Sequence, residues 1–262
     1  MPSASKTSGL LDLTGEVALV TGASSGLGAH FAKVLATHGA SVVVCARRRE
    51  RLDALASEIA DAGGRALAVT LDVSSRKEIG SAFDAAEKVF GTVSIVVNNA
   101  GISGQKPALE MNEEDWRSVL SVNLDAVWYV AQEAARRMVA GKRTGTIINI
   151  ASLLGIRAAP TLVAYAAAKA GVIHMTSTLA PELARHGIRV NAIAPGYIVT
   201  EMNEAFFTSP KGEEFIKGIP QRRVGKPSDL DGALLLLASE RASGFMTGST
   251  IVVDGGHMHK AL

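Results

Sequence analysis

Cysteine is almost absent from this chain of 262 residues, which contains only Cys45. A single cysteine cannot form an internal disulfide, a state typical of proteins that fold in a reducing compartment. Cys45 lies in the apolar run 41–46, where we expect a thiol packed in the core. The sequence therefore predicts a cytoplasmic protein that folds without disulfide bonds.

Excess charge and long apolar runs are also missing. The formal net charge is +2, and the basic residues are scattered except for the cluster Arg47, Arg48, Arg49 and Arg51. Without a basic face, nucleic acid is not expected as a partner. Residues 1–9 are polar, and no run approaches about 18 uninterrupted apolar residues, so we predict neither a signal peptide nor a membrane span.

Three catalytic signatures are missing as well. No glycine-rich loop ends in Gly-Lys-Ser or Gly-Lys-Thr, which argues against a nucleoside triphosphatase. No Gly-x-Ser-x-Gly elbow surrounds Ser152, and the histidines form no cluster with zinc-ligand spacing. We therefore predict neither a serine-hydrolase triad nor a metal site.

The sequence does contain ample material for a core, with 47% hydrophobic and 20% charged residues. Short runs rich in Val and Ile alternate with longer amphipathic segments, which is typical of βαβ units and a parallel sheet. No repeat or linker divides the chain, so one α/β domain over 1–262 is expected, with 1–12 as an N-terminal arm. The predicted strands are Val17–Val20, Ser41–Cys45, Ala66–Leu71, Ser94–Val97, Thr146–Ile150, Arg189–Ile193 and Thr250–Val253.

Six helices are predicted between these strands, at Gly26–His38, Glu50–Ala62, Ser75–Phe90, Glu113–Ala140, Thr161–His186 and Ser228–Ala238. Pro181 lies inside the fifth, where it is expected to cost about 3 kcal/mol or to end the helix. The segment from Pro195 to Lys226 has no clear period. An unstructured stretch of that length in a compact domain predicts a lid over about 196–226.

A glycine-rich turn follows the first predicted strand and leads directly into a helix. Its residues run Thr21-Gly22-Ala23-Ser24-Ser25-Gly26-Leu27-Gly28. Glycines there let the backbone approach a pyrophosphate bound on the amides of the helix N-terminus. A tight βα turn with no ligand is the alternative.

Tyr165 and Lys169 are four residues apart in a predicted helix, so both side chains lie on one face. A phenol has a pKa of about 10, and a neighbouring ammonium favours the phenolate and lowers that pKa. The pair is therefore a candidate proton-transfer device. A half-buried Tyr beside a solvated Lys is the alternative.

The spacing Thr-Gly-x-x-x-Gly-x-Gly, with three residues between the first two glycines, resembles that of the short-chain dehydrogenase/reductase family. The resemblance, which includes 3-oxoacyl reductases, extends over nearly the whole chain. Its other motifs, in family order, are Asp72, Asn98-Asn99-Ala100-Gly101, Asn123, Ser152, Tyr165-x-x-x-Lys169, Pro195-Gly196 and Thr200.

The resemblance implies a Rossmann-type doubly wound sheet of about seven parallel strands, with helices on both faces. It also implies a nicotinamide dinucleotide site, with Gly22, Gly26 and Gly28 around the diphosphate and Asp72 near the adenine. The implied cofactor contacts are Gly22, Ser24, Ser25, Gly26, Leu27, Gly28, Arg47, Arg48, Asp72, Val73, Asn99, Ala100, Gly101, Tyr165, Lys169, Pro195, Gly196, Ile198 and Thr200.

The choice between NAD and NADP depends on the end of the second strand. An acidic residue there binds the ribose hydroxyls of NAD, whereas an arginine accommodates the 2′-phosphate of NADP. The strand ends Cys45-Ala46-Arg47-Arg48 with no acid, so NADP(H) is predicted. Ser24 is expected to add a hydroxyl to the same phosphate, and Arg49 and Arg51 fit solvated charges on the next helix.

The same resemblance assigns the catalytic roles. Tyr165 is the implied general acid and base, and Ser152, thirteen residues earlier, polarises the substrate carbonyl. Lys169 lowers the phenol pKa and binds the nicotinamide ribose. Asn123 is implied to kink its helix and to hold a water on a proton path from Lys169.

The predicted reaction is hydride transfer between nicotinamide and a ketone or secondary alcohol. A 3-oxoacyl thioester, a hydroxysteroid and a small alcohol all remain open, as do stereochemistry and physiological direction. Lys106, Arg157 and Lys211 either attract an anionic carrier or are ordinary surface charges. A non-catalytic NADP-binding sensor or scaffold is the alternative function.

A homo-oligomer, either a dimer or a tetramer, is also implied by the resemblance. The apolar stripe through Val119, Val122, Val127 and Val130 fits such packing, but it fits the core of a monomer equally well.

Overall fold

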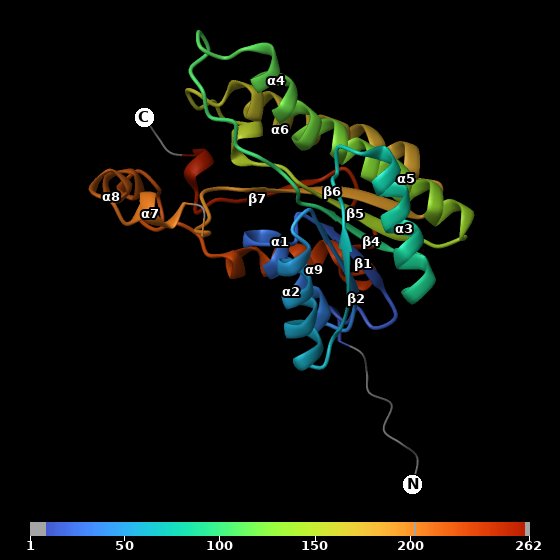
Figure 1. The fold of residues 1–262 in the computed structure, drawn as a ribbon. Coiled ribbons are helices and arrows are strands. Elements are labelled where there is room, and N and C mark those ends of the chain that lie inside the picture. The colour runs from blue at the N-terminus through green and yellow to red at the C-terminus, as the bar shows by residue number, and fades with distance from the viewer. Residues whose placement is uncertain (1–8, 202, 260–262) are drawn as a thin grey trace.

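The computed structural model describes residues 9–201 and 203–259, and its centre is one sheet of seven parallel strands (Figure 1). The strand order is β3-β2-β1-β4-β5-β6-β7. All seven predicted strands are confirmed, with ends shifted by one or two residues where they differ. The strands are β1 Val17–Thr21, β2 Ser41–Ala46, β3 Arg65–Thr70, β4 Ile95–Asn98, β5 Gly145–Ile150, β6 Ile188–Pro195 and β7 Thr250–Val253.

Helices cover both faces of the sheet, as the doubly wound prediction requires (Figure 1). One face packs against α1 (Gly26–Thr37), α2 (Arg49–Asp61) and α9 (Asp231–Ala238). The other packs against α3 (Arg76–Phe90), α5 (Ala126–Ala140) and α6 (Val163–Ala184). Because both faces are covered, central strands such as β2 are buried at every residue and read as continuous apolar runs.

The strand order reverses at β1, which pairs with β2 on one side and β4 on the other. In open α/β sheets, ligands bind at the carboxyl ends of the strands beside such a switch point. The glycine-rich turn follows β1, and the segment 98–101 lies at the end of β4. The fold therefore brings these two sequence motifs together.

The predicted helix Glu113–Ala140 is wrong as a single regular helix. It is divided into α4 (Glu113–Leu120), a π-helical turn at Ser121–Asp125 and α5. Asn123 lies in the middle of this turn and is fully buried. Such π turns insert an extra residue into a helix and are frequent at functional sites.

Two further helices correct the prediction of an unstructured stretch from Pro195 to Lys226. These are α7 (Glu204–Phe207) and α8 (Pro210–Lys217), which project from one end of the sheet (Figure 1). Both are too short to show a clear hydrophobic period in the sequence. The final part of the described chain adds α10 (Glu240–Ser243) and a 3-10 turn at His257–His259.

Pro181 neither ends nor divides α6, which continues to Ala184. The residue lies in the last turn on the exposed side, where water can satisfy the carbonyl group of Ser177 that loses its helical partner. Its position explains why the expected break is absent. Cys45 is buried as predicted, and burial raises the pKa of its thiol to about 12.

Part of the predicted N-terminal arm, residues 1–8, lies outside the described residues. The rest is attached to the fold, because the Leu10 carbonyl accepts a hydrogen bond of 2.7 Å from Ser239 Oγ and Leu11 packs against the core.

Candidate active site

The glycine-rich turn after β1 is shaped by two close backbone approaches. A Cβ atom on Gly22 would lie 2.8 Å from the Ala100 Cα, and one on Gly28 would lie 2.4 Å from the Gly22 carbonyl oxygen. Gly22 and Gly26 also have φ values of 68° and 55°, which disfavour other residues. The turn leads directly into the N-terminus of α1, where Leu27 is partly buried.

Thr21 and Asn99 fix this turn to the end of β4. The backbone amides of Asn99 and Ala100 donate to Thr21 Oγ1 over 3.0 and 3.1 Å, and Asn99 Nδ2 donates to the Thr21 carbonyl over 3.0 Å. The Asn99 side chain thus holds the phosphate turn in shape. Sequence analysis did not assign Thr21 a role, although it is the first residue of the motif.

Arg48 is the arginine that reaches the glycine-rich turn. Its Nη2 donates to Ser24 Oγ over 2.9 Å and to Ser25 Oγ over 2.8 Å. Arg49 instead pairs with Asp53 within α2. The end of β2 and the glycine-rich turn therefore present a guanidinium and two hydroxyls together, a donor set suited to a phosphate monoester.

Asp72 lies after β3, near Arg47. Its carboxylate accepts hydrogen bonds of 2.7 and 2.9 Å from Ser74 Oγ and the Ser74 amide. These bonds lower the pKa of the Asp72 carboxyl against the effect of burial, and Arg47 lowers it further. Val73 beside it is buried.

The segment after β6 crosses to the glycine-rich turn. A Cβ atom on Gly26 would lie 3.6 Å from Thr200 Cγ2, which brings the two predicted cofactor contacts together. Asn203 holds the segment, accepting from the Thr200 amide over 2.8 Å and donating to the Ile198 carbonyl over 2.9 Å. Asn203 was not singled out in the sequence. Pro195 ends β6, and the Gly196 amide donates to Val253 over 2.9 Å.

Ser152 and Tyr165 meet at the carboxyl edge of the sheet. Ser152 follows β5 directly, Tyr165 lies on the first turns of α6, and their hydroxyls are hydrogen-bonded. Ser152 Oγ also accepts from the Leu154 amide over 3.1 Å. The predicted pair of hydroxyls is therefore brought together by β5 and α6.

Lys169 lies one helical turn below Tyr165, with 4% of its surface exposed. Its Nζ donates to the Ile150 carbonyl over 2.7 Å and lies 5.7 Å from the centre of the Tyr165 ring. Burial lowers the pKa of the Lys169 ammonium to about 8. The alternative of a solvated lysine is therefore wrong.

The expected lowering of the Tyr165 pKa by Lys169 is not observed. Burial raises the pKa of the Tyr165 hydroxyl, the hydrogen bond with Ser152 opposes this, and Tyr197 raises it further. The geometry explains the difference, because the Lys169 ammonium bonds to the Ile150 carbonyl and not to the phenol oxygen. Within this chain alone, Tyr165 is held in its protonated form.

Asn123 contacts backbone rather than Lys169. Its Oδ1 accepts from the Ile102 amide and its Nδ2 donates to the Ile102 carbonyl, both over 2.8 Å. A Cβ atom on Gly101 would lie 3.3 Å from the same Oδ1. Asn123 thus fixes the segment after β4 to the π-helical turn. Its side chain points from this turn toward the backbone of Ile102.

A buried polar chain that sequence analysis did not assign lies beneath the site. Asn98 Nδ2 donates to Asn149 Oδ1, and Asn149 Nδ2 donates to Thr176 Oγ1, each over 2.9 Å. These residues tie β4, β5 and α6 together. Only the strand pairing identifies this role, since an Asn-Asn pair in the sequence equally predicts an Asx turn.

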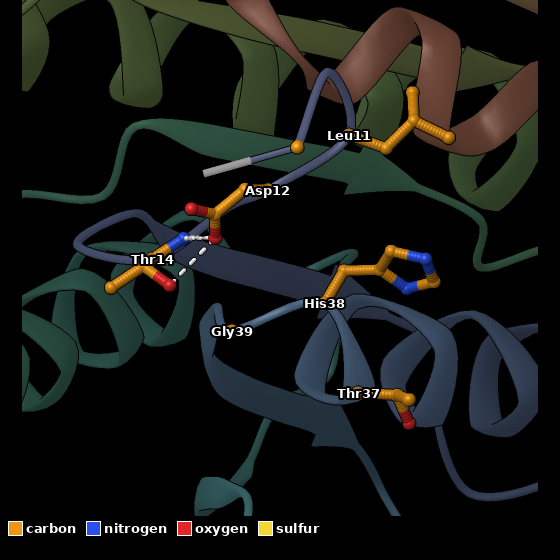
Figure 2. A pocket seen from close by; sticks show the side chains of 7 residues that line it. Leu11, Asp12, Thr14, Thr37, His38 and Gly39 are labelled. Atoms are coloured by element: carbon orange, nitrogen blue, oxygen red, sulfur yellow. Dashed lines mark hydrogen bonds between the residues drawn. The ribbon is translucent and has the colours of Figure 1, made fainter. Parts of the chain in front are cut away.

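A shallow hollow of about 380 Å³ lies at the amino ends of the strands, before β1 and β2 (Figure 2). Its walls, including Thr14, His38 and Gly39, precede β1 and β2, whereas the candidate site lies at the strands' carboxyl ends. Thr14 is hydrogen-bonded to Asp12 within it. The hollow contains neither the glycine-rich turn nor the paired hydroxyls.

Among residues 9–201 and 203–259, no group of three or more His, Cys, Asp or Glu side chains is placed to hold a metal ion. No helix there is both long and apolar enough to span a membrane.

The fold and these motifs define a nucleotide-dependent oxidoreductase class. A family model described as enoyl-(acyl carrier protein) reductase matches residues 22–258. The chain belongs to the short-chain dehydrogenase/reductase family.

Several relatives match almost the whole chain. The 3-oxoacyl-[acyl-carrier-protein] reductase of Synechocystis sp. is 40% identical over 93% of this chain and 97% of its own length. The 3beta-hydroxysteroid dehydrogenase 1 of Eggerthella lenta is 42% identical over 94% of each. The gluconate 5-dehydrogenase of Burkholderia cenocepacia J2315, solved in complex with NADP and tartrate, has a TM-score of 0.90 and 38% identity, covering 96% of this chain and 98% of that one.

Proposed function

We propose that this protein is an NADP-dependent oxidoreductase that transfers hydride between the nicotinamide and a ketone or secondary alcohol. The observation that carries the proposal is the hydrogen-bonded pair of hydroxyls, Ser152 and Tyr165, above the buried Lys169. It lies beside a glycine-rich strand-to-helix turn, packed closely against the end of β4, of the kind that binds a dinucleotide pyrophosphate. Relatives of differing substrate share this family, so the reaction type is better supported than any one substrate.

The residues that would hold the cofactor surround the β1–β4 switch point. Gly22, Gly26 and Gly28 form the diphosphate turn, which Asn99 and Ala100 hold in place. Arg48, Ser24 and Ser25 form the phosphate-binding set. We retain the other predicted contacts as part of this proposal: Leu27, Arg47, Asp72, Val73, Gly101, Tyr165, Lys169, Pro195, Gly196, Ile198 and Thr200.

The bound cofactor supplies or accepts the hydride. In ketone reduction, Tyr165 donates its proton to the developing alkoxide, and in alcohol oxidation the phenolate accepts it. Ser152 donates a hydrogen bond to the same oxygen. Lys169 supplies positive charge beneath the phenol, and Asn123 fixes the neighbouring segment.

The segment 196–226 is proposed to cover the substrate. Its aromatic rings cluster, with Tyr197 4.6 Å from Phe215 and 6.3 Å from Phe207 between ring centres. An apolar cover of this kind excludes water from the reacting carbonyl. It favours a substrate with a hydrophobic body.

NADP preference is tested by replacing Arg48 with alanine. Removing the guanidinium from Ser24 and Ser25 is expected to weaken NADPH binding about 10- to 100-fold and to leave NADH binding within about 3-fold. Dissociation constants measured by nucleotide fluorescence check this. The matched control is Arg49→Ala, whose side chain pairs with Asp53, and an equal loss in both variants would refute the assignment.

The reaction is tested by following NADPH absorbance with a panel of ketones, 3-oxoacyl thioesters and oxosteroids. Turnover of any of them excludes the alternative of a non-catalytic NADP-binding sensor or scaffold. A protein that binds NADPH tightly but reduces none of these compounds would contradict the proposal.

We also propose that the protein is cytoplasmic and forms a homo-oligomer. The buried free thiol of Cys45 supports the reducing compartment, and the family resemblance supports the oligomer. The predicted stripe is no argument for a partner, because Val119, Val127 and Val130 are buried in the chain's own core and Val122 packs against it. The fully exposed Phe245 ring, at 107% relative exposure, is a better candidate contact. Light scattering is expected to give a dimer or tetramer, and a monomer at micromolar concentration would contradict the proposal.

A further inference from the structure

Three cations were candidates for contact with an anionic substrate, and the structure separates them. Lys106 Nζ is paired with the Asp115 carboxylate over 2.5 Å. Lys211 is exposed on the surface of α8. Arg157 is partly buried, and within residues 9–201 and 203–259 it forms no ion pair with a carboxylate.

Arg157 is rigidly connected to the catalytic serine. The Gly155 amide donates to the Ser152 carbonyl over 3.0 Å, and the Arg157 amide donates to the Leu153 carbonyl over 2.9 Å. A Cβ atom on Gly155 would lie 2.7 Å from the Lys169 carbonyl carbon, so this turn is pressed against α6. The backbone of Arg157 is therefore fixed relative to both Ser152 and Lys169.

The Arg157 guanidinium lies beside the aromatic cover of the site. Its Nη1 donates to the His257 carbonyl, and the His257 ring lies 5.5 Å from the Tyr197 ring. Burial raises the pKa of the Tyr197 hydroxyl, and the charge of Arg157 opposes this. Tyr197 in turn raises the pKa of Tyr165. Arg157, Tyr197 and Tyr165 therefore lie close enough to interact electrostatically.

We propose that Arg157 binds a carboxylate of the substrate, so that the protein acts on oxo acids and hydroxy acids. A guanidinium carries five N–H donors, and the described chain uses one of them, on a neutral carbonyl. A partly desolvated cation without an anionic partner gains most from a carboxylate, which it binds bidentately. This inference rests on the proposed function and narrows its substrates, disfavouring neutral sterols and simple alcohols.

The test compares two oxo acids, levulinate and acetoacetate, with their methyl esters. Each pair presents the same carbonyl with and without the charge. In Arg157→Gln, kcat/KM for the acids is expected to fall about 10- to 100-fold, mainly through KM, and for the esters by less than about 3-fold. Glutamine keeps an N–H donor for the His257 carbonyl, and Arg157→Lys, which keeps the charge without the bidentate fork, is expected to retain only part of the preference for acids.

Lys88→Gln is the control, because it removes the same charge from the exposed surface of α3, outside the segment 196–226, and is expected to change neither rate. Equal losses for acids and esters in Arg157→Gln would overturn the inference and leave Arg157 as a tether of the C-terminal turn. Wild-type protein that reduces only the esters would also overturn it, with the proposed function intact. Reduction of none of the four compounds, nor of the wider ketone panel, would refute the function itself.

Discussion

Replacing Tyr165 with phenylalanine is expected to lower kcat for ketone reduction about 10²- to 10⁴-fold, the range that positioned proton donors supply. The ring and its packing are retained, and only the hydroxyl bonded to Ser152 is lost. NADPH affinity should therefore change by less than about 3-fold. Stopped-flow absorbance for turnover and fluorescence titration for binding separate the two effects.

The pH profile gives an independent check on the same residue. Because burial raises the Tyr165 pKa, the phenol is protonated throughout the neutral range, as ketone reduction requires. The rate of reduction is expected to hold at neutral pH and to fall as pH rises through that pKa. Alcohol oxidation requires phenolate and should rise over the same interval.

Ser152→Ala is the companion variant, since it removes the hydrogen-bond donor and leaves the acid in place. Its pH profile should keep the wild-type shape at a lower rate. If Tyr165→Phe retained the wild-type rate, the proton would have to come from another group, and the family's motif would not describe the chemistry here.

The sheet could be predicted from sequence because its causes are local. Most strands are short runs rich in β-branched residues, and covering helices such as α3 and α5 are amphipathic, so all seven strands were found within two residues of their ends. Within the helix 113–140 the family resemblance implied a kink at Asn123, but a lone Asn does not specify a π-helical turn. The π-helical turn is fixed by two bonds from Asn123 to Ile102, which is 21 residues away.

The candidate site, too, was predictable only where its features depend on local sequence. The sequence predicted that Tyr165 and Lys169 share one helical face and that Ser152 follows a neighbouring strand. It could not predict the direction of the Tyr165 pKa, which depends on burial and on the bond that Lys169 makes to Ile150. Nor could it choose between Arg47 and Arg48, since consecutive side chains at the end of a strand point in opposite directions.

Replacing Lys169 with methionine is expected to stabilise the protein without bound nucleotide while lowering turnover about 100-fold or more. Lys169 is 4% exposed and its ammonium bonds to one neutral carbonyl, so the charge is poorly compensated. Removing the buried charge raises the unfolding free energy by more than the loss of the hydrogen bond to Ile150 lowers it, since that bond contributes about 1 kcal/mol. At about pH 7 the net gain in unfolding free energy should be about 1–2 kcal/mol.

The sign of the pH dependence distinguishes charge burial from improved packing. The Lys169 pKa falls from 10.5 to about 8 on folding, so the penalty is complete below about pH 8. Between those values the unfolded chain binds more protons than the folded one, and wild-type stability rises with pH. The advantage of Lys169→Met should therefore shrink as pH rises toward about 10.

Denaturant titrations of both proteins at several pH values measure this difference, with Lys88→Met as a surface control expected to stay within about 0.5 kcal/mol of wild type. If the stability gain of Lys169→Met did not depend on pH, it would arise from packing alone. A variant less stable than wild type at neutral pH would mean that the ammonium is better solvated than its burial indicates. The expected result instead identifies Lys169 as a charge kept in the core at a cost to stability because the reaction at Tyr165 needs it.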